Sequence, residues 1–230
     1  MRKLVVETGL GEVAFRYEEG AFSRPPVAVL FHGFGRDAES LDPWRQRLPF
    51  EIIAARLPGH KAPEMTPSLD LWAEAFRQAL SAFPTRPALV IGESLGAVIA
   101  LSMGLPCVVI EPFLSTAKLW PVRASLKLGR ARGLNHPDEL VDGLFDDKDY
   151  SWVLPKITAP ALVVGGDVPL GVPRSLMKAP SLLDDEDFET FSRHPLVETR
   201  RVAGNHLLMV ENAEACLGAI LDHSAKHELA

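Results

Sequence analysis

Cysteine is scarce in this chain of 230 residues, which contains only Cys107 and Cys216. Two thiols cannot form a disulfide framework, and their separation does not match the spacing of zinc ligands. Both lie in apolar stretches of the sequence, so we interpret them as buried structural thiols. This cysteine usage is typical of a reducing compartment, and we expect a cytoplasmic protein.

An excess of positive charge is also missing. The chain has 24 Lys and Arg residues against 30 Asp and Glu residues, which gives a formal net charge of −6. Proteins that bind nucleic acids carry a basic patch or have a high isoelectric point. The composition therefore argues against a nucleic-acid partner.

Long apolar runs are absent as well. The longest, residues 97–110, is interrupted by Ser102, Gly104 and Pro106, and it is shorter than the roughly 18 to 20 residues that cross a bilayer. The first seven residues include two basic ones but no apolar segment of signal-peptide length. We expect no membrane span and a single soluble domain over residues 1–230, of unspecified oligomeric state.

What the sequence does contain is an alternation of short β-branched runs with longer helical patterns, which predicts a sheet flanked by helices. The expected strands are Leu4–Glu7, Val13–Glu18, Val27–Phe31, Glu51–Ala55, Ala88–Ile91, Cys107–Ile110, Ala161–Val164 and Val197–Val202. From the third onward, several are almost entirely apolar, as in strands covered on both faces. The first two are more polar and could form an antiparallel edge.

One helix is clear from its periodicity. Six apolar residues between Trp72 and Phe83 recur on one helical face, which indicates core packing. Thr66 is expected to cap this helix, with Pro67 at its first position. A different pattern, rich in charges of both signs, runs from Phe113 to Pro155. Its length of about 40 residues favours a small helical lid over a plain helical crossover.

The pentapeptide Gly92-Glu93-Ser94-Leu95-Gly96 stands between an apolar strand and a helical pattern. G-x-S-x-G in this context is the sharp turn that exposes a nucleophilic serine at a helix N-terminus, where glycines let strand and helix approach closely. Ser94 is therefore the expected nucleophile. We expect the side chain of Glu93 to point away from it and to be structural.

Two further segments supply what a serine nucleophile needs. His32-Gly33-Phe34-Gly35 follows a strand, and the backbone N–H groups of Phe34 and Leu95 are expected to form an oxyanion hole. His32 itself is interpreted as a structural residue that orients the backbone. His206, directly after the last strand, is the expected general base. His60, in another turn after a strand, either lines the mouth of the site or is bonded to backbone.

Asp167 follows the strand Ala161–Val164 through two glycines, and it is the expected acid that orients His206. The chain order Ser94, Asp167, His206 is the order found in one particular fold. Together, these ordered motifs resemble the α/β-hydrolase superfamily of serine hydrolases over nearly the whole chain from Val27. The resemblance implies a mostly parallel eight-stranded sheet with helices on both faces, a lid after the sixth strand, and no metal or organic cofactor.

The turn around Asp167 departs from the family's pattern, because Val168 and Pro169 occupy the region where the acid commonly lies. Some thioesterase-like members carry their acid after the preceding strand, where this chain has Glu111. The acidic cluster Asp184, Asp185 and Asp187 is a further alternative. Asp167 is the first assignment, with Glu111 next.

The leading functional hypothesis is cleavage of a carboxylic ester or thioester through an acyl-serine. The low aromatic content, 7%, and the modest lid favour a small or medium acyl substrate. The same residues could serve an acyltransferase, a lactonase or a hydrolase of C–C bonds. A non-catalytic ligand-binding protein of the same fold is the alternative from another class, and the unusual turn at Asp167 is the only feature in its favour.

Overall fold

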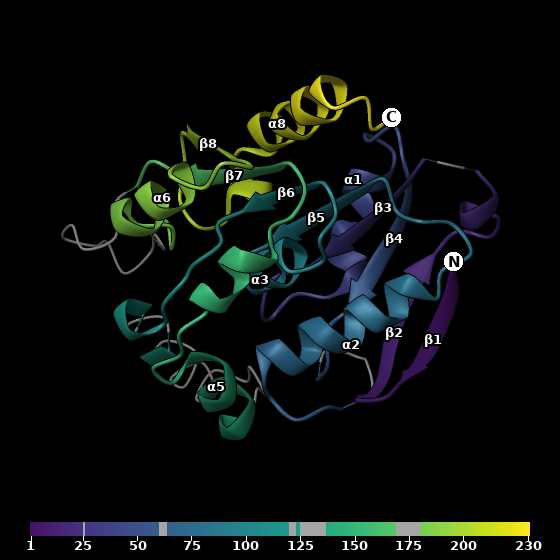
Figure 1. The fold of residues 1–230 in the computed structure, drawn as a ribbon, viewed down its shortest axis with the longest axis horizontal. Coiled ribbons are helices and arrows are strands. Elements are labelled where there is room, and N and C mark those ends of the chain that lie inside the picture. Colours follow the sequence, from purple (N-terminus) through teal and green to yellow (C-terminus); the bar gives the residue numbers. More distant parts are fainter. Residues whose placement is uncertain (25, 60–63, 120–122, 125–136, 169–179) are drawn as a thin grey trace.

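A computed structural model describes the chain from residue 1 to 230 apart from residues 25, 60–63, 120–122, 125–136 and 169–179. Its centre is an eight-stranded sheet with the order β1-β2-β4-β3-β5-β6-β7-β8 (Figure 1). The strands are β1 (Arg2–Thr8), β2 (Gly11–Tyr17), β3 (Val27–Phe31), β4 (Glu51–Arg56), β5 (Leu89–Glu93), β6 (Cys107–Ile110), β7 (Ala161–Gly166) and β8 (Val197–Val202). All eight expected strands are confirmed.

The two polar N-terminal strands form the antiparallel part of the sheet. Strand β1 pairs antiparallel with β2, and β2 pairs antiparallel with β4. From β4 across to β8, every neighbouring pair is parallel. The carboxyl ends of six strands therefore meet at one edge of the sheet, which is where α/β sheets bind ligands.

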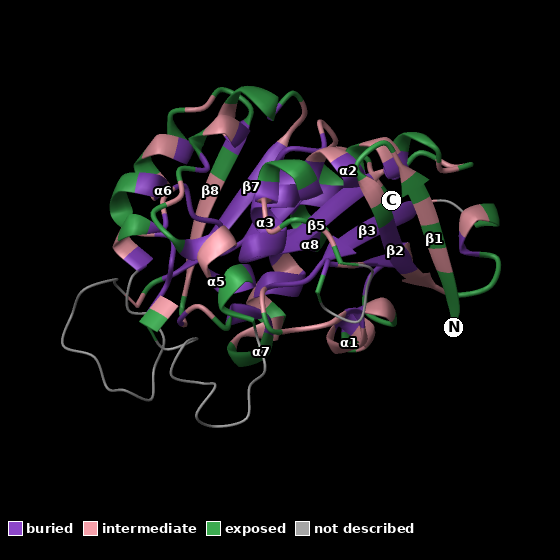
Figure 2. Ribbon diagram, turned by 90° about the horizontal axis from the view of Figure 1, so that it is seen from below, coloured by how far each residue is buried: buried purple, intermediate pink, exposed green. Residues whose placement is uncertain are grey.

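Each face of the sheet is covered by its own hydrophobic core. In β3, Val27, Val29 and Phe31 belong to one core, and Ala28 and Leu30 belong to the other. This is the period-2 alternation of a strand buried on both faces. The central strands are buried, whereas the edge strands β1 and β8 carry exposed residues (Figure 2).

Two groups of helices provide the covers. The core that contains Val29 includes side chains from α2 (Leu69–Ser81), α3 (Leu95–Leu101) and α5 (Asp138–Phe145). The core that contains Leu30 includes side chains from α1 (Asp42–Arg45), α7 (Leu208–Glu211) and α8 (Ala213–Lys226). Helix α6 (Asp185–Ser192) precedes β8. No helix in the described ranges is both long and apolar enough to cross a membrane.

Helix α2 starts later than its sequence pattern suggests. The expected cap at Thr66 with Pro67 at the first position is wrong, because the helix begins at Leu69 with Ser68 as its N-cap residue. The backbone carbonyl of Thr66 instead accepts hydrogen bonds from Ser68 N and from the Trp72 indole N–H. A local turn thus competes with, and replaces, the first helical turn.

The described part of the expected lid contains a short 3-10 helix at Ala117–Leu119, helix α5 and a second 3-10 helix at Ser151–Lys156. The aromatic rings of Phe34 and Phe145 meet edge to face, with centroids 5.2 Å apart. Helix α5 is therefore packed against the turn that follows β3. Residues 120–122 and 125–136 of this segment lie outside the described residues.

The buried His223, which lies against the partly exposed His227, makes the stability of the fold dependent on pH. His223 in α8 is 3% exposed, its ring centroid lies 4.5 Å from that of His227, and Glu198 and Lys226 are its other charged neighbours. Burial, with the neighbouring His227, lowers the pKa of His223 from 6.5 to about 4. The folded protein thus favours the neutral ring, whereas the unfolded chain binds a proton below about pH 6.5.

We expect the free energy of unfolding to fall by about 2–3 kcal/mol as the pH falls from 6.5 to 4 on account of His223. Urea unfolding of the wild type and of His223→Gln at several pH values measures this. Glutamine cannot be protonated, so the variant should lose that part of the pH dependence. His194 is partly exposed, and His194→Gln is the matched control, which should behave as wild type. If the free energy of unfolding changed with pH equally in all three proteins, the assignment to His223 would be contradicted.

Candidate active site

Four of the candidate residues lie just beyond the carboxyl ends of adjacent parallel strands. Ser94 directly follows β5, Glu111 follows β6 and Asp167 follows β7. His206 comes four residues after the end of β8. Because β5, β6, β7 and β8 are consecutive in the sheet, the fold brings all four residues to the same edge.

Ser94 sits on a tight, strained turn. Its φ of 54° and ψ of −119° lie outside the regions that residues with a side chain ordinarily adopt. A Cβ on Gly92 would lie 2.4 Å from Gly96 O, and a Cβ on Gly96 would lie 2.5 Å from His32 O. The two glycines of the motif are therefore required by the close approach of β5, α3 and the turn after β3, as the sequence predicts.

The turn after β3 lies against the serine. A Cβ on Gly33 would be 3.2 Å from the Cβ of Ser94, and an ordinary side chain there would crowd the nucleophile. Leu95 is the first residue of α3, where helical N–H groups have no intrahelical acceptor. Phe34 and Leu95 thus belong to the two segments that adjoin Ser94. Their role as oxyanion donors stays a prediction.

His32 and Glu93 have structural contacts, in agreement with the sequence interpretation. The ring of His32 is fully buried, its Nε2 lies 3.2 Å from Leu57 N, and its Nδ1 lies 2.9 Å from Gly33 O. An Nε2 that accepts from the backbone leaves the proton on Nδ1, so the ring ties two turns together. The buried carboxylate of Glu93 pairs with Arg36, at 2.6 and 2.8 Å from Nη1.

The ring of His206 meets a carboxylate, and that carboxylate is Glu111. Nδ1 of His206 lies 3.3 Å from Oε2 of Glu111. The Glu111 side chain is fully buried, and its φ of 58° is left-handed, like that of Ser94. Strained backbone at two neighbouring strand ends is typical of a functional site.

Three donors from elsewhere in the chain hold the same carboxylate. Oε1 of Glu111 accepts from Gly166 N at 2.5 Å and from Ser181 Oγ at 2.8 Å. Oε2 accepts from Leu182 N at 2.6 Å. These hydrogen bonds give both oxygens of the buried carboxylate a partner in the protein interior. The Glu111 carboxylate is thus held in one orientation beside the imidazole.

Asp167 is placed differently. It is exposed, and its Oδ1 accepts a hydrogen bond of 2.9 Å from Gly204 N, two residues before His206. No hydrogen bond joins Asp167 to the His206 ring in the structure as described. Asp167 therefore contacts the backbone of the histidine loop, whereas Glu111 contacts the histidine itself.

The acidic cluster has other partners. Asp184 caps α6 by accepting from Asp187 N. Lys118 bridges the two, at 2.7 Å from Asp184 and 2.8 Å from Asp187, and Asp185 pairs with Arg201. These contacts hold the segment before α6 in place. His60, the other histidine considered near the site, lies outside the described residues.

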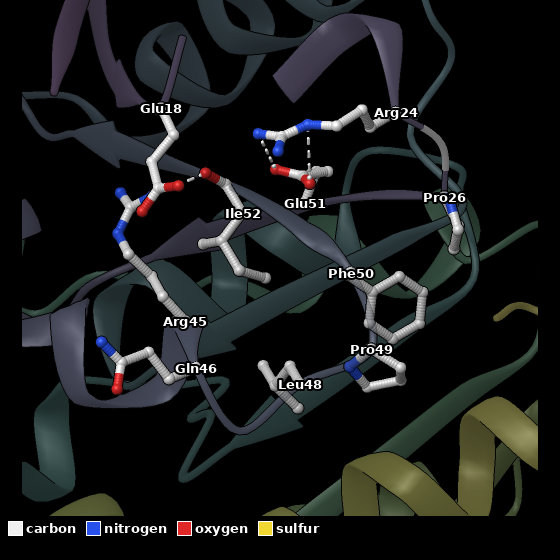
Figure 3. A pocket seen from close by; sticks show the side chains of 10 residues that line it. All are labelled: Glu18, Arg24, Pro26, Arg45, Gln46, Leu48, Pro49, Phe50, Glu51 and Ile52. Atoms are coloured by element: carbon white, nitrogen blue, oxygen red, sulfur yellow. Dashed lines mark hydrogen bonds and ion pairs between the residues drawn. The ribbon is translucent and has the colours of Figure 1, made fainter. Parts of the chain in front are cut away.

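Cavities lie at the amino ends and at the carboxyl ends of the parallel strands. One of about 420 Å³ is at the amino ends of β3 and β4, far from Ser94, with Phe50, Arg45 and the Arg24–Glu51 pair in its wall (Figure 3). Another of about 420 Å³ lies at the carboxyl end of β7 and is lined by Asp167, Arg201 and residues 183–186. The second adjoins the edge that carries the candidate catalytic residues.

Burial makes the two thiols unreactive, as the sequence suggests. It raises the pKa of Cys107 to about 12 and is the first cause that raises that of Cys216 to about 12. Neither cysteine is disulfide-bonded. Among the described residues, no group of three or more His, Cys, Asp or Glu side chains is arranged to hold a metal ion.

Comparison with known proteins agrees with this architecture. The profile of the Alpha/beta hydrolase family matches residues 28–219. That match covers most of the chain, so the protein belongs to the alpha/beta hydrolase family. No curated protein matches the chain significantly.

Solved structures of similar fold include several hydrolases. An esterase from Thermogutta terrifontis is 15% identical with a TM-score of 0.70, over 98% of this chain and 99% of that one. An enol-lactonase from Burkholderia xenovorans LB400 is 15% identical with a TM-score of 0.75, over 96% and 100%. A thioesterase domain from the curacin biosynthetic pathway is 16% identical with a TM-score of 0.65, over 96% and 99%. At these identities the likeness establishes the shared fold.

Proposed function

We propose that this protein is a serine hydrolase that cleaves a carboxylic ester or thioester of a small or medium acyl group. Ser94 is the nucleophile, His206 the general base and Glu111 the acid of the triad. The observation that carries the proposal is the buried Glu111 carboxylate on Nδ1 of His206, beside a serine held in a strained turn. This combination supplies the nucleophile, the base and the orienting acid that covalent catalysis by serine requires.

The chemistry follows from the tautomer that Glu111 selects. A carboxylate on Nδ1 keeps the proton on that nitrogen and leaves the lone pair on Nε2. Nε2 of His206 takes the proton of Ser94 as Oγ attacks the carbonyl carbon, and then returns it to the leaving group. Glu111 stabilises the transient imidazolium. No hydrogen bond joins Ser94 to His206 among the described side chains, and such contacts often tighten only when substrate binds.

The oxyanion is proposed to bind the backbone N–H groups of Phe34 and Leu95. Leu95 opens α3, whose N-terminus favours negative charge. Each such donor contributes about 3–4 kcal/mol to the transition state. Water then attacks the acyl-serine, with His206 as base, and the carboxylic acid product is released.

The substrate class rests on the surroundings of the site. Phe34 packs edge to face on Phe145 of α5, which is itself buried. We propose that segment 113–155 is a lid. Its described part would close over the turn after β3 that contains Phe34 and leave room for a short acyl chain. The fold neighbours named for ester and thioester cleavage support this choice, and an enol-lactonase of the same fold makes a lactone the second candidate.

We further propose a cytoplasmic location, with which two buried free thiols agree.

A panel of acyl substrates tests the proposal. We expect turnover of p-nitrophenyl acetate and butyrate, with kcat/KM at least tenfold higher than for the decanoate, because the proposed lid leaves room for a short acyl chain only. The panel includes a short acyl-coenzyme A thioester and a five-membered enol lactone. Turnover of the lactone alone would move the proposal to the second candidate. No turnover of any member by the folded protein would reject it, and product formed only with an added alcohol would indicate an acyltransferase.

A further inference from the structure

Ser181 is a buried serine whose hydroxyl group points at the proposed catalytic acid. It is 1% exposed, and its Oγ lies 2.8 Å from Oε1 of Glu111 and 3.2 Å from the carbonyl oxygen of Leu183. The hydroxyl has one proton to donate. The Glu111 oxygen is the nearer acceptor, at 2.8 Å against 3.2 Å for the Leu183 carbonyl, so we place the proton on the bond to Glu111.

The donors divide the two oxygens of Glu111 between them. Oε1 takes Gly166 N and the Ser181 hydroxyl, whereas Oε2 takes Leu182 N and faces His206. The terminal torsion of a glutamate is broad and roughly two-fold, so the side chain does not fix its own carboxylate plane. Bonds to both oxygens set that plane and point Oε2 at the imidazole. Ser181 supplies the only side-chain donor among the three.

Ser181 is itself linked to the histidine loop. Its backbone N donates to Val168 O at 3.0 Å, and Val168 N donates to Gly204 O at 3.2 Å. Gly204 N in turn donates to Asp167. The acid, its serine donor and the loop that carries His206 thus share one hydrogen-bonded network that joins the end of β7 to the segment before α7.

We propose that Ser181 is a positioning residue for the triad acid: its hydroxyl fixes the Glu111 carboxylate so that Oε2 orients His206. The inference rests on the proposed function. Without the hydroxyl, the carboxylate turns more freely, and more negative charge remains on the oxygen that faces the imidazole. The first effect lowers the rate, and the second favours the protonated imidazolium.

Ser181→Ala therefore has two expected effects. The kcat for p-nitrophenyl acetate should fall by about ten- to a hundredfold, the range that a hydrogen bond to a charged group corresponds to. The midpoint of the acid limb of kcat/KM should move to higher pH, by about half a unit to one unit. Ser181→Thr keeps the hydroxyl and should return the midpoint to the wild-type value. Ser181→Cys has a side chain of similar shape whose thiol is a weak donor. Its kcat and its acid-limb midpoint should lie between those of Ser181→Ala and those of the wild type.

The matched control is Ser224→Ala. Ser224 is also buried, 2% exposed, and its Oγ donates to the Ile220 carbonyl within α8, away from the site. We expect a loss of stability from this variant but no shift of the acid limb. A purely structural role of Ser181 would give the same result, so an unshifted limb in Ser181→Ala and Ser181→Cys overturns the inference.

A double variant separates this inference from the proposed function. If Ser181 acts through Glu111, the loss caused by Ser181→Ala should nearly vanish in a Glu111→Gln background. Equal losses in both backgrounds contradict the inference and leave the triad intact. A Glu111→Gln variant with wild-type activity would instead reject Glu111 as the acid. The rate at which a fluorophosphonate modifies the protein, measured against pH, gives the same comparison when no ester is turned over well.

Discussion

Ser94→Ala is expected to lower kcat for ester hydrolysis by about 10⁴- to 10⁶-fold, to the level that transition-state binding alone supports. In the proposed mechanism the acyl intermediate forms on Ser94 Oγ, which alanine lacks. The fold should persist, since alanine fits the space of a serine and Gly92 and Gly96 keep the approach of strand and helix open. Steady-state kinetics with p-nitrophenyl acetate, beside the melting temperature, measure both effects.

Ser102→Ala is the control for this result. Ser102 is the C-cap residue of α3, the helix that begins after Ser94, and it is 4% exposed. Its hydroxyl donates to the Ile99 carbonyl within that helix. Its removal should cost stability without a large change in kcat. If Ser94→Ala kept more than about a tenth of the wild-type rate, an acyl-serine pathway through this residue would be excluded.

The second large effect is expected from Glu111→Gln, which should lower kcat by about 10³- to 10⁴-fold, as loss of the orienting acid does in serine proteases. The amide is uncharged and can present an N–H group to the ring, which favours the wrong tautomer of His206. The charge that stabilises the imidazolium is also lost. Kinetics with the same ester, with circular dichroism to confirm folding, provide the measurement.

Asp167→Asn is the matched comparison at the neighbouring strand end. The asparagine Oδ1 can still accept from Gly204 N, the hydrogen bond that the described residues make with the Asp167 carboxylate. We expect kcat within about tenfold of the wild type, the cost of at most one weakened hydrogen bond. The reverse ranking, with Asp167→Asn severely impaired and Glu111→Gln active, would return the role of the acid to Asp167.

Much of this fold is readable from the sequence because its strands are buried. Three expected strands, at residues 27–31, 107–110 and 197–202, have the observed bounds. The first two end where an apolar run gives way to His32 and to Glu111, whereas the third is marked by the β-branched residues among its charges. The turn at Ser94 can also be predicted from the sequence, because the spacing of its glycines reflects a steric requirement of the backbone. The start of α2 cannot, because the local turn at Thr66 satisfies the same backbone groups as a helical turn.

The acid could not be chosen from the sequence with the same certainty. Glu111 and Asp167 both follow parallel strands at one edge, so apolar patterning treats them alike. What separates them is the left-handed φ of 58° at Glu111, together with donors from Ser181 and Leu182, some 70 residues further along the chain. A glycine in the sequence indicates that a positive φ is possible, whereas a glutamate gives no such indication. The sequence offers two signals: Val168 and Pro169 after Asp167 are unusual for an acid loop, and Glu111 stands where some thioesterase-like members carry their acid.

The most direct test of the account is mass spectrometry of the intact protein after exposure to a fluorophosphonate, followed by peptide mapping. The account predicts a single adduct on the wild type, located on Ser94, with no adduct on Ser94→Ala and a much slower reaction of Glu111→Gln. An adduct on another residue, or none on the folded wild type under conditions that label a known serine hydrolase, would contradict it.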